Sequence, residues 1–223
     1  MKAFIFFLGV GFSAFAVNAA LGEIENGFAH EQSDQKILTI SVLDWATANS
    51  LFREFIQDKD IPFKYPIDGC YARATEMAKI AEDKKILMGR VYAEGILVAK
   101  TDSAESPVVV WGYHIATVAY VKSQKGDVEL MVFDPSLFDK PVTTEMWKQR
   151  MLDRSSADKP VIRDFYYGSR FQYYRQSVED NRESWSQVDL ADARDMMKRY
   201  QPLQDLSSNR EANAERPKAQ GAK

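Results

Sequence analysis

The middle of the chain contains five segments rich in valine, isoleucine and aromatic residues, and helical patterns precede them. The segments are Lys85–Met88, Val91–Ala99, Pro107–Tyr113, His114–Val121 and Val128–Phe133. Residues of these types favour strands, and polar or glycine-containing links between such segments indicate turns. The sequence therefore predicts an α+β fold in which a mainly antiparallel sheet packs against helices.

The last two of these segments are joined by the polar link Ser123–Gly126, which is typical of a hairpin loop. If the loop centres on Gln124, two residues face each other when their numbers sum to 248. His114 then faces Asp134. This pair is the only polar one on an otherwise apolar face. Because a slip of one residue would move the two side chains to opposite faces, their proximity depends on the register.

The single cysteine of the chain, Cys70, stands at the start of a helical pattern. Ala74, Met77, Ala78 and Ala81 share its face of the expected helix. The backbone N–H groups of a first helical turn lack internal partners, and the helix dipole there favours a negative charge. A cysteine in this position is stabilised as the thiolate, although a cysteine that simply packs inward is the alternative interpretation.

The N-terminus has the layout of a secretory signal peptide. A basic start at Lys2 precedes the apolar run Ala3–Val17, and small residues follow it. This run of roughly 15 residues is shorter than the ~20 that cross a bilayer, and the pattern predicts cleavage after Ala19. We therefore expect a secreted or periplasmic protein without membrane attachment after cleavage, with an uncleaved anchor as the alternative.

The remaining 204 of the 223 residues suit one domain with two polar flanks. Residues 20–37 lack periodicity and are expected to form a flexible leader, whereas residues 38–200 are expected to form the catalytic domain. A first helix should follow Ser41, which would cap it, and Asp189–Tyr200 should form the last helix. The polar residues 201–223 are expected to be a disordered tail.

Cysteine catalysis needs a thiolate, an imidazole and a group that orients the imidazole. The chain has two histidines, and His30 lies in the polar leader, whereas His114 lies in an apolar strand. Cys70, His114 and Asp134 are therefore the candidate catalytic residues. One cysteine and one strand histidine do not form a closed zinc site, so no metal or cofactor is expected. The net charge of −3, without basic stretches, argues against nucleic acid as a partner.

Four blocks of sequence surround these candidates. They are NSLF at Asn49–Phe52, FKYPIDGCYARA at Phe63–Ala74, WGYH at Trp111–His114, and DPSLF at Asp134–Phe138 followed by PVT and Trp147. In kind and in order these blocks resemble those of the bacterial protein-glutaminases, which are protein-glutamine deamidases. The resemblance implies a core like that of papain and the transglutaminases, with Cys70 as nucleophile, His114 as base and Asp134 as the residue that orients it.

The resemblance also implies hydrolysis of glutamine side chains through a thioester on Cys70, with release of ammonia. Its partners would be proteins or peptides with exposed glutamine, and no immunity or inhibitor protein is identified by the sequence. The backbone N–H of Cys70 is the natural oxyanion donor. The indole N–H of Trp111 is a conceivable second donor, with packing against the sheet as its alternative role.

Three other functions stay open at the level of sequence. A transglutaminase shares the first half of the reaction and transfers the acyl group to an amine. A cysteine peptidase uses a similar triad on backbone amides. A binding module that retains the fold without catalysis is the third alternative.

Overall fold

In the computed structural model, which describes residues 28–33, 36–103, 106–123, 125–155, 157–175 and 182–214, seven strands form one sheet. The strands are β1 (Phe28–Ser33), β2 (Lys36–Asp44), β3 (Gly89–Lys100), β4 (Val108–Lys122), β5 (Val128–Phe133), β6 (Val142–Thr143) and β7 (Val161–Gly168). The helices are α2 (Trp45–Gln57), α3 (Cys70–Asp83), α4 (Thr144–Arg150) and α5 (Gln187–Ala214).

The sheet is mainly antiparallel, as the sequence predicts. Its main path runs β1-β2-β4-β3-β7, and β5 pairs with β4 and β6. Of the pairings between the strands named above, only that of β2 with β4 is parallel. The α+β fold class is confirmed, and the strand β4, which crosses the middle of this sheet, carries His114.

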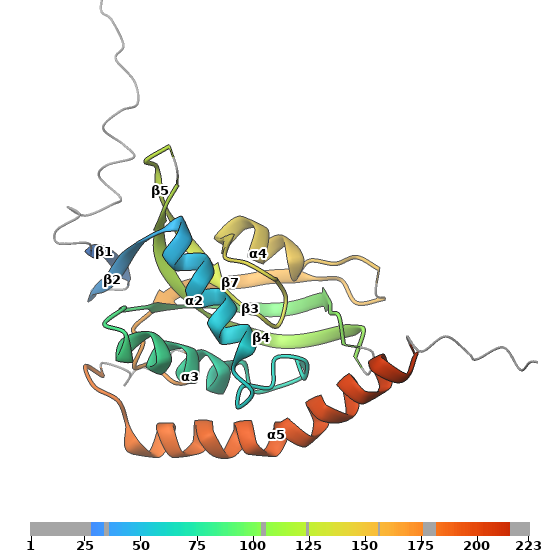
Figure 1. Ribbon diagram of the computed structural model, residues 1–223. Helices are drawn as coiled ribbons and strands as arrows, with labels where there is room; N and C mark the ends of the chain where they lie inside the picture. The colour runs from blue at the N-terminus through green and yellow to red at the C-terminus, as the bar shows by residue number, and fades with distance from the viewer. Residues whose placement is uncertain are drawn as a thin grey trace, which may run out of the picture.

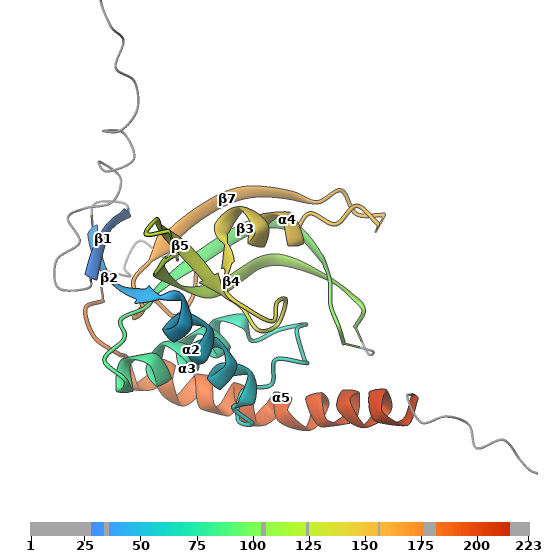
Figure 2. The same ribbon diagram turned by 45° about the horizontal axis from the view of Figure 1, so that its top comes forward.

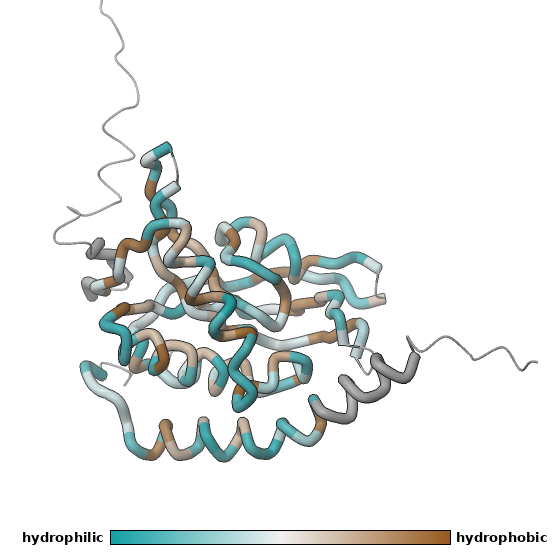
Figure 3. Tube along the Cα trace, viewed as in Figure 1, coloured by the Kyte–Doolittle hydropathy of each residue, from teal (hydrophilic) through white to brown (hydrophobic). Residues whose placement is uncertain are grey.

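Helix α3 lies between the sheet and α5, as Figures 1 and 2 both show. Almost every residue of its first three turns is buried, because it packs on β4 on one side and on α5 on the other. Figure 3 shows that α5 is mostly hydrophilic with isolated hydrophobic positions. These positions recur every three or four residues and face the core; they are Leu190, Ala193, Met196, Met197 and Tyr200.

The β4–β5 hairpin is paired two residues away from the predicted register. Val118 faces Val132, so paired residue numbers sum to 250 rather than 248. The difference arises because the loop centres on Lys125, with Gly126 at φ +94° and Ser123 N–H donating to the Asp127 carbonyl at 2.7 Å. Side chains alternate between faces with a period of two, so a shift of two residues keeps every side chain on its predicted face.

Two of the predicted strand boundaries are wrong. The predicted segments Pro107–Tyr113 and His114–Val121 form one strand, β4, which runs without interruption from Val108 to Lys122. Lys85–Met88 is not a strand but the connection that ends α3. Lys85 adopts φ 63°, and the Ile86 N–H returns to the Ala81 carbonyl at 2.9 Å, so these residues close the helix instead of pairing.

The first helix is capped by Asp44 and not by Ser41. The Asp44 carboxylate accepts a hydrogen bond from the Thr47 N–H at 2.7 Å, and the helix begins at Trp45. Ser41 lies inside β2, where its hydroxyl accepts from the Leu87 N–H at 2.8 Å. The strand therefore continues through the position that the sequence assigned to the cap, because pairing with β4 extends it to Asp44.

The two polar flanks are more ordered than the sequence predicts. Residues 28–33, expected in the flexible leader, pair with β2 as β1, whose backbone hydrogen bonds need no apolar pattern. Helix α5 continues through Pro202 to Ala214, although residues 201–223 were expected to be disordered. Proline removes one helical hydrogen bond, but Tyr200 and Gln204 on its two sides bond to the loop before α3. The predicted signal peptide, residues 1–19, lies outside the described residues.

The helices and the potential ligand side chains of the described residues bear on membrane and metal binding. None of the helices in that part of the chain is long and apolar enough to cross a membrane. Within the same residues, no group of three or more histidine, cysteine, aspartate or glutamate side chains is arranged to hold a metal ion.

Replacement of Arg90 by methionine should destabilise the fold strongly. The fully buried guanidinium donates to the Arg170 carbonyl, the Tyr173 carbonyl and the Thr75 hydroxyl, at 3.1, 3.3 and 2.6 Å. Its loss leaves buried acceptors unpaired, so we expect the free energy of unfolding to fall by about 3 kcal/mol. Urea denaturation measures this change, with Arg163→Met as the exposed control. Equal effects of the two substitutions would contradict the structural role of Arg90.

Candidate active site

Cys70 is the first residue of α3, and the loop before it is held by side chains. Gly69 precedes the helix with φ +81°, and its N–H donates to the Asp68 carboxylate at 2.7 Å. The Cys70 side chain is buried, with 7% of its surface exposed. The residue therefore occupies the predicted helix N-terminus, where backbone N–H groups are free to stabilise a negative charge.

Two buried donors serve the four consecutive carbonyls before Gly69. The Arg73 guanidinium donates to the carbonyls of residues 65 and 68, at 3.0 and 2.7 Å. The Trp111 indole N–H is shared between the carbonyls of residues 66 and 67, at 3.0 and 3.1 Å. Irregular backbone can be buried only when its polar groups are paired, so these contacts fix the shape of the loop that delivers Cys70.

His114 lies on β4 with 1% of its surface exposed. Its Nε2 is 2.8 Å from the Asp134 carboxylate, and its ring stacks between two indoles. The ring centroids lie 4.4 Å from Trp111 and 5.6 Å from Trp147. The Nδ1 atom has no hydrogen-bond partner of normal geometry among the described residues, so it is the nitrogen left to exchange a proton.

Asp134 directly follows β5 and is 3% exposed. One carboxylate oxygen accepts from both His114 Nε2 and Trp147 Nε1, each at 2.8 Å, and the other accepts from the Ser136 N–H at 3.2 Å. Burial alone would raise the pKa of Asp134, but these hydrogen bonds and the nearby charges lower it below its usual value. The carboxylate is therefore charged at neutral pH.

The same surroundings act on His114 in the opposite direction. Burial lowers the pKa of an imidazole, whereas Asp134 and the Cys70 side chain favour its protonated form. Together, Asp134 and Cys70 overcome the effect of burial and raise the pKa of His114 to about 9. At neutral pH the site can therefore hold an imidazolium hydrogen-bonded to a carboxylate.

Arg73 adds a second buried cation, one helical turn after Cys70. It is 2% exposed, and its Nη2 has no partner among the described residues. Burial lowers the pKa of Arg73, while the charges of Cys70 and Asp134 oppose that shift. Arg73 and a protonated His114 thus bring two cations to this part of the core, beside the Asp134 carboxylate.

Two contacts were not predicted from the sequence. The Trp147 indole supplies the second hydrogen bond to Asp134, and its only sequence signal was its place after the DPSLF block. Trp111 was considered as an oxyanion donor, but both of its contacts are with loop carbonyls. Its indole N–H is therefore committed to the loop before Cys70, and the backbone N–H of Cys70 remains the candidate oxyanion donor.

Two pockets flank these residues. One is lined by Glu94, Tyr113, Tyr174 and Arg175. Tyr113 precedes His114, and the Tyr174 ring lies 4.8 Å from that of Tyr71, which follows Cys70. This pocket therefore lies beside the candidate pair and is a candidate entrance for substrate.

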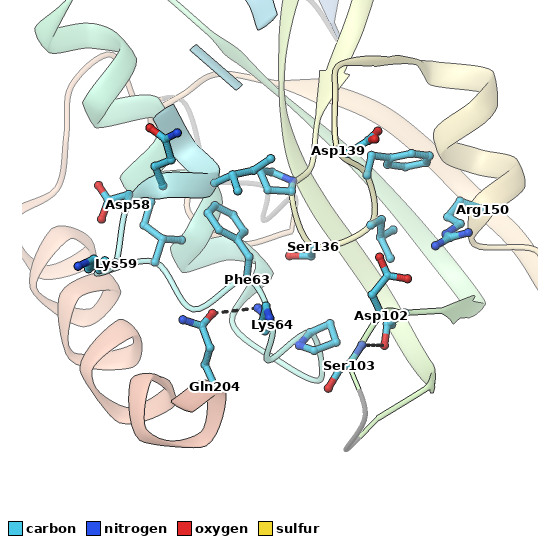
Figure 4. A pocket seen from close by; sticks show the side chains of 18 residues that line it. Asp58, Lys59, Phe63, Lys64, Asp102, Ser103, Ser136, Asp139, Arg150 and Gln204 are labelled. Atoms are coloured by element: carbon cyan, nitrogen blue, oxygen red, sulfur yellow. Dashed lines mark hydrogen bonds between the residues drawn. The ribbon is translucent and has the colours of Figure 1, made fainter. Parts of the chain in front are cut away.

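The second pocket, of about 600 Å³, is shown in Figure 4. It lies between the loop that follows Asp134 and the loop that precedes Cys70. Ser136 lines it from the first loop, and Phe63 and Lys64 line it from the second. Gln204 of α5 closes another side. The loop that follows Asp134 and the loop that precedes Cys70 thus line the same pocket.

Comparison with known proteins supports one family. The model of a family described as glutaminase matches residues 48–151. A crystal structure of protein-glutaminase has a TM-score of 0.61 at 28% identity, covering 72% of this chain and 89% of that one. The NMR structure of protein-glutaminase from Chryseobacterium proteolyticum has a TM-score of 0.60 at 28% identity, covering 73% and 90%.

A crystal structure of pro-protein-glutaminase has a TM-score of 0.62 at 26% identity, covering 84% of this chain and 66% of that chain. None of the curated proteins matches the chain. The fold is thus the α+β fold of the solved protein-glutaminases. The family match and these structures together support assignment of the chain to the protein-glutaminase family. The matched residues 48–151 contain Cys70, His114 and Asp134 and end before α5.

The pH dependence of the free energy of unfolding should reveal the raised pKa of His114. A group whose pKa is higher in the folded state contributes stability below its unfolded pKa, about 6.5, and loses it as the pH rises through about 9. In a Cys70→Ala variant, where no thiol titrates and Asp134 alone favours the imidazolium, the free energy of unfolding should fall by up to about 1.4 kcal/mol per pH unit from pH 6.5 upward, over a window that ends below pH 9. Chemical denaturation at several pH values measures the slope. A Cys70→Ala/His114→Gln double variant with the same slope would contradict the assignment to His114.

Proposed function

We propose that the protein hydrolyses glutamine side-chain amides of proteins or peptides to glutamate and ammonia. Cys70 is the nucleophile in this proposal, His114 the acid and base, and Asp134 the orienting carboxylate. The observation that supports it most is the buried 2.8 Å hydrogen bond between His114 and Asp134, in a chain of the protein-glutaminase family whose only cysteine begins α3. Solved structures that resemble the chain at 28% identity are protein-glutaminases.

The first half of the proposed reaction forms a thioester. The Cys70 thiolate attacks the side-chain carbonyl carbon, and the oxygen becomes an oxyanion near the Cys70 N–H. As the tetrahedral intermediate collapses, the carbon–nitrogen bond breaks and the His114 imidazolium gives its proton to the departing amine, which leaves as ammonia. Asp134 holds Nε2 throughout, so that Nδ1 transfers the proton.

The second half restores the enzyme. Neutral His114 takes a proton from water, and the resulting hydroxide attacks the thioester carbon. The carbon–sulfur bond then breaks, which leaves glutamate on the substrate, a thiolate at Cys70 and an imidazolium at His114. A transglutaminase would differ at this step alone, because an amine would replace the water.

The proposed partners are proteins or peptides with exposed glutamine, and the proposed location is outside the cytoplasm after removal of residues 1–19. The proposal includes no cofactor or metal. The pocket beside Tyr113 and Tyr174 would receive the glutamine side chain, since it borders residues adjacent to both Cys70 and His114.

The central test measures ammonia release and substrate mass together. With a glutamine-containing protein and a blocked glutamine dipeptide, each deamidation should release one ammonia and add about one mass unit, without new N-termini. Cys70→Ala and His114→Ala should each lower turnover by ~10⁴ or more. His30→Ala, the matched histidine control, should retain wild-type turnover. Transfer to an added amine would also release ammonia, but the same mass spectra distinguish it, because the substrate would then gain the mass of the amine instead of about one mass unit. No ammonia from wild-type protein would overturn the proposal.

The hydrogen bond from Trp147 to Asp134 should contribute to turnover. Trp147→Phe keeps a ring beside His114 but removes the 2.8 Å bond to the carboxylate. A hydrogen bond to a charged group contributes about 1.5–3 kcal/mol, so we expect kcat to fall by about tenfold or more. Trp185→Phe is the matched control, because it removes a 2.7 Å indole bond to Glu82, away from the site. Steady-state kinetics in which both variants match wild type would contradict this role.

A further inference from the structure

Helix α5 lies outside the matched residues 48–151, yet it contacts the loop that delivers Cys70. The Tyr200 ring lies 4.8 Å from the ring of Tyr65. Its hydroxyl donates to the Asp68 carboxylate at 2.6 Å. One turn further along α5, Gln204 accepts from the Lys64 N–H at 2.9 Å, the bond drawn in Figure 4. Residues far apart in sequence are thus joined immediately before the nucleophile.

The Asp68 carboxylate links the contact with α5 to the start of α3. One oxygen of Asp68 accepts from Tyr200, and the other accepts from the Gly69 N–H at 2.7 Å. The Gly69 carbonyl in turn accepts from the Arg73 N–H at 3.0 Å. The peptide groups on both sides of Gly69 are therefore held, and the second of these groups contains the N–H of Cys70.

Gly69 also makes room for Tyr200. Its φ of +81° is unfavourable for other residues, and a Cβ atom there would lie 2.9 Å from the Tyr200 ring. The helix start has no side-chain cap of its own. The Tyr200 ring therefore covers Gly69, which is the N-cap position of α3. The Tyr200 hydroxyl donates to the neighbouring Asp68 carboxylate.

We propose that Tyr200 is a positioning residue for Cys70. Its hydroxyl orients Asp68, whose carboxylate holds the Asp68–Gly69 peptide next to Cys70 and so sets the position of both the thiol and the N–H that would bind the oxyanion. This inference rests on the proposed function of Cys70 as nucleophile. It makes α5 a part of the catalytic unit and not only a cover for α3.

The chain offers a matched control at the other end of α5. The Tyr173 hydroxyl donates to the Asp192 carboxylate at 2.8 Å, a bond of the same kind that does not involve the loop before Cys70. Tyr200→Phe and Tyr173→Phe each remove one hydroxyl and keep the ring. Any general weakening of the attachment of α5 should therefore appear in both variants.

The test combines kinetics with a readout that needs no substrate. Tyr200→Phe should lower kcat about tenfold with KM nearly unchanged, and it should slow the alkylation of Cys70 by iodoacetamide. It should also shift the pH profile of that alkylation. Tyr173→Phe should match wild type in all three measurements, and both variants should unfold at similar temperatures.

A double-variant cycle tests the route through Asp68. Asp68→Ala should reproduce the defect of Tyr200→Phe, and the double variant should be no slower than Asp68→Ala alone. Additive defects, or a Tyr200→Phe variant that matches Tyr173→Phe in alkylation, would overturn the inference. Failure of wild-type protein to release ammonia would instead overturn the proposed function, and the alkylation rates would still decide whether Tyr200 positions Cys70.

Discussion

The buried hydrogen bond between His114 and Asp134 determines much of the architecture around it. Charges removed from water are tolerated only when the protein supplies partners for them. Here the sheet brings the two residues to one face, α4 contributes the Trp147 indole, and the loop after β5 contributes the Ser136 N–H. Each element near the site therefore carries a polar contact for the pair as well as apolar surface for the core.

The position of Cys70 depends on a second set of constraints, which act on the loop before α3. Four consecutive carbonyls of this loop are paired with only two side chains, those of Arg73 and Trp111. Trp111 also stacks on His114, so the same indole touches both halves of the candidate site. A change at Trp111 would consequently alter the loop and the imidazole together, which couples the positions of Cys70 and His114.

The sequence predicted the faces of side chains better than their exact partners. Strand alternation placed His114 and Asp134 on one side of the sheet, and an error of two residues in the register preserved that result. The Asp44 cap, the order of β1 and the continuation of α5 past Pro202 were missed. Each of these depends on pairing with a distant segment, such as Tyr200 with Asp68, that local patterns do not contain. The hydrogen bond from Trp147 to Asp134 could not be predicted from the sequence for the same reason.

The charged state of the site is therefore a property of the folded chain. In an unfolded chain His114 would titrate near its ordinary value, and Arg73 would be hydrated. Folding removes water from both and places them around Asp134 and Cys70, so that the pKa of His114 rises to about 9. Folding thereby places Arg73, His114 and Asp134 beside Cys70, a combination that no local segment of the sequence contains. The surroundings of the single cysteine therefore exist only where the sheet and α3 meet.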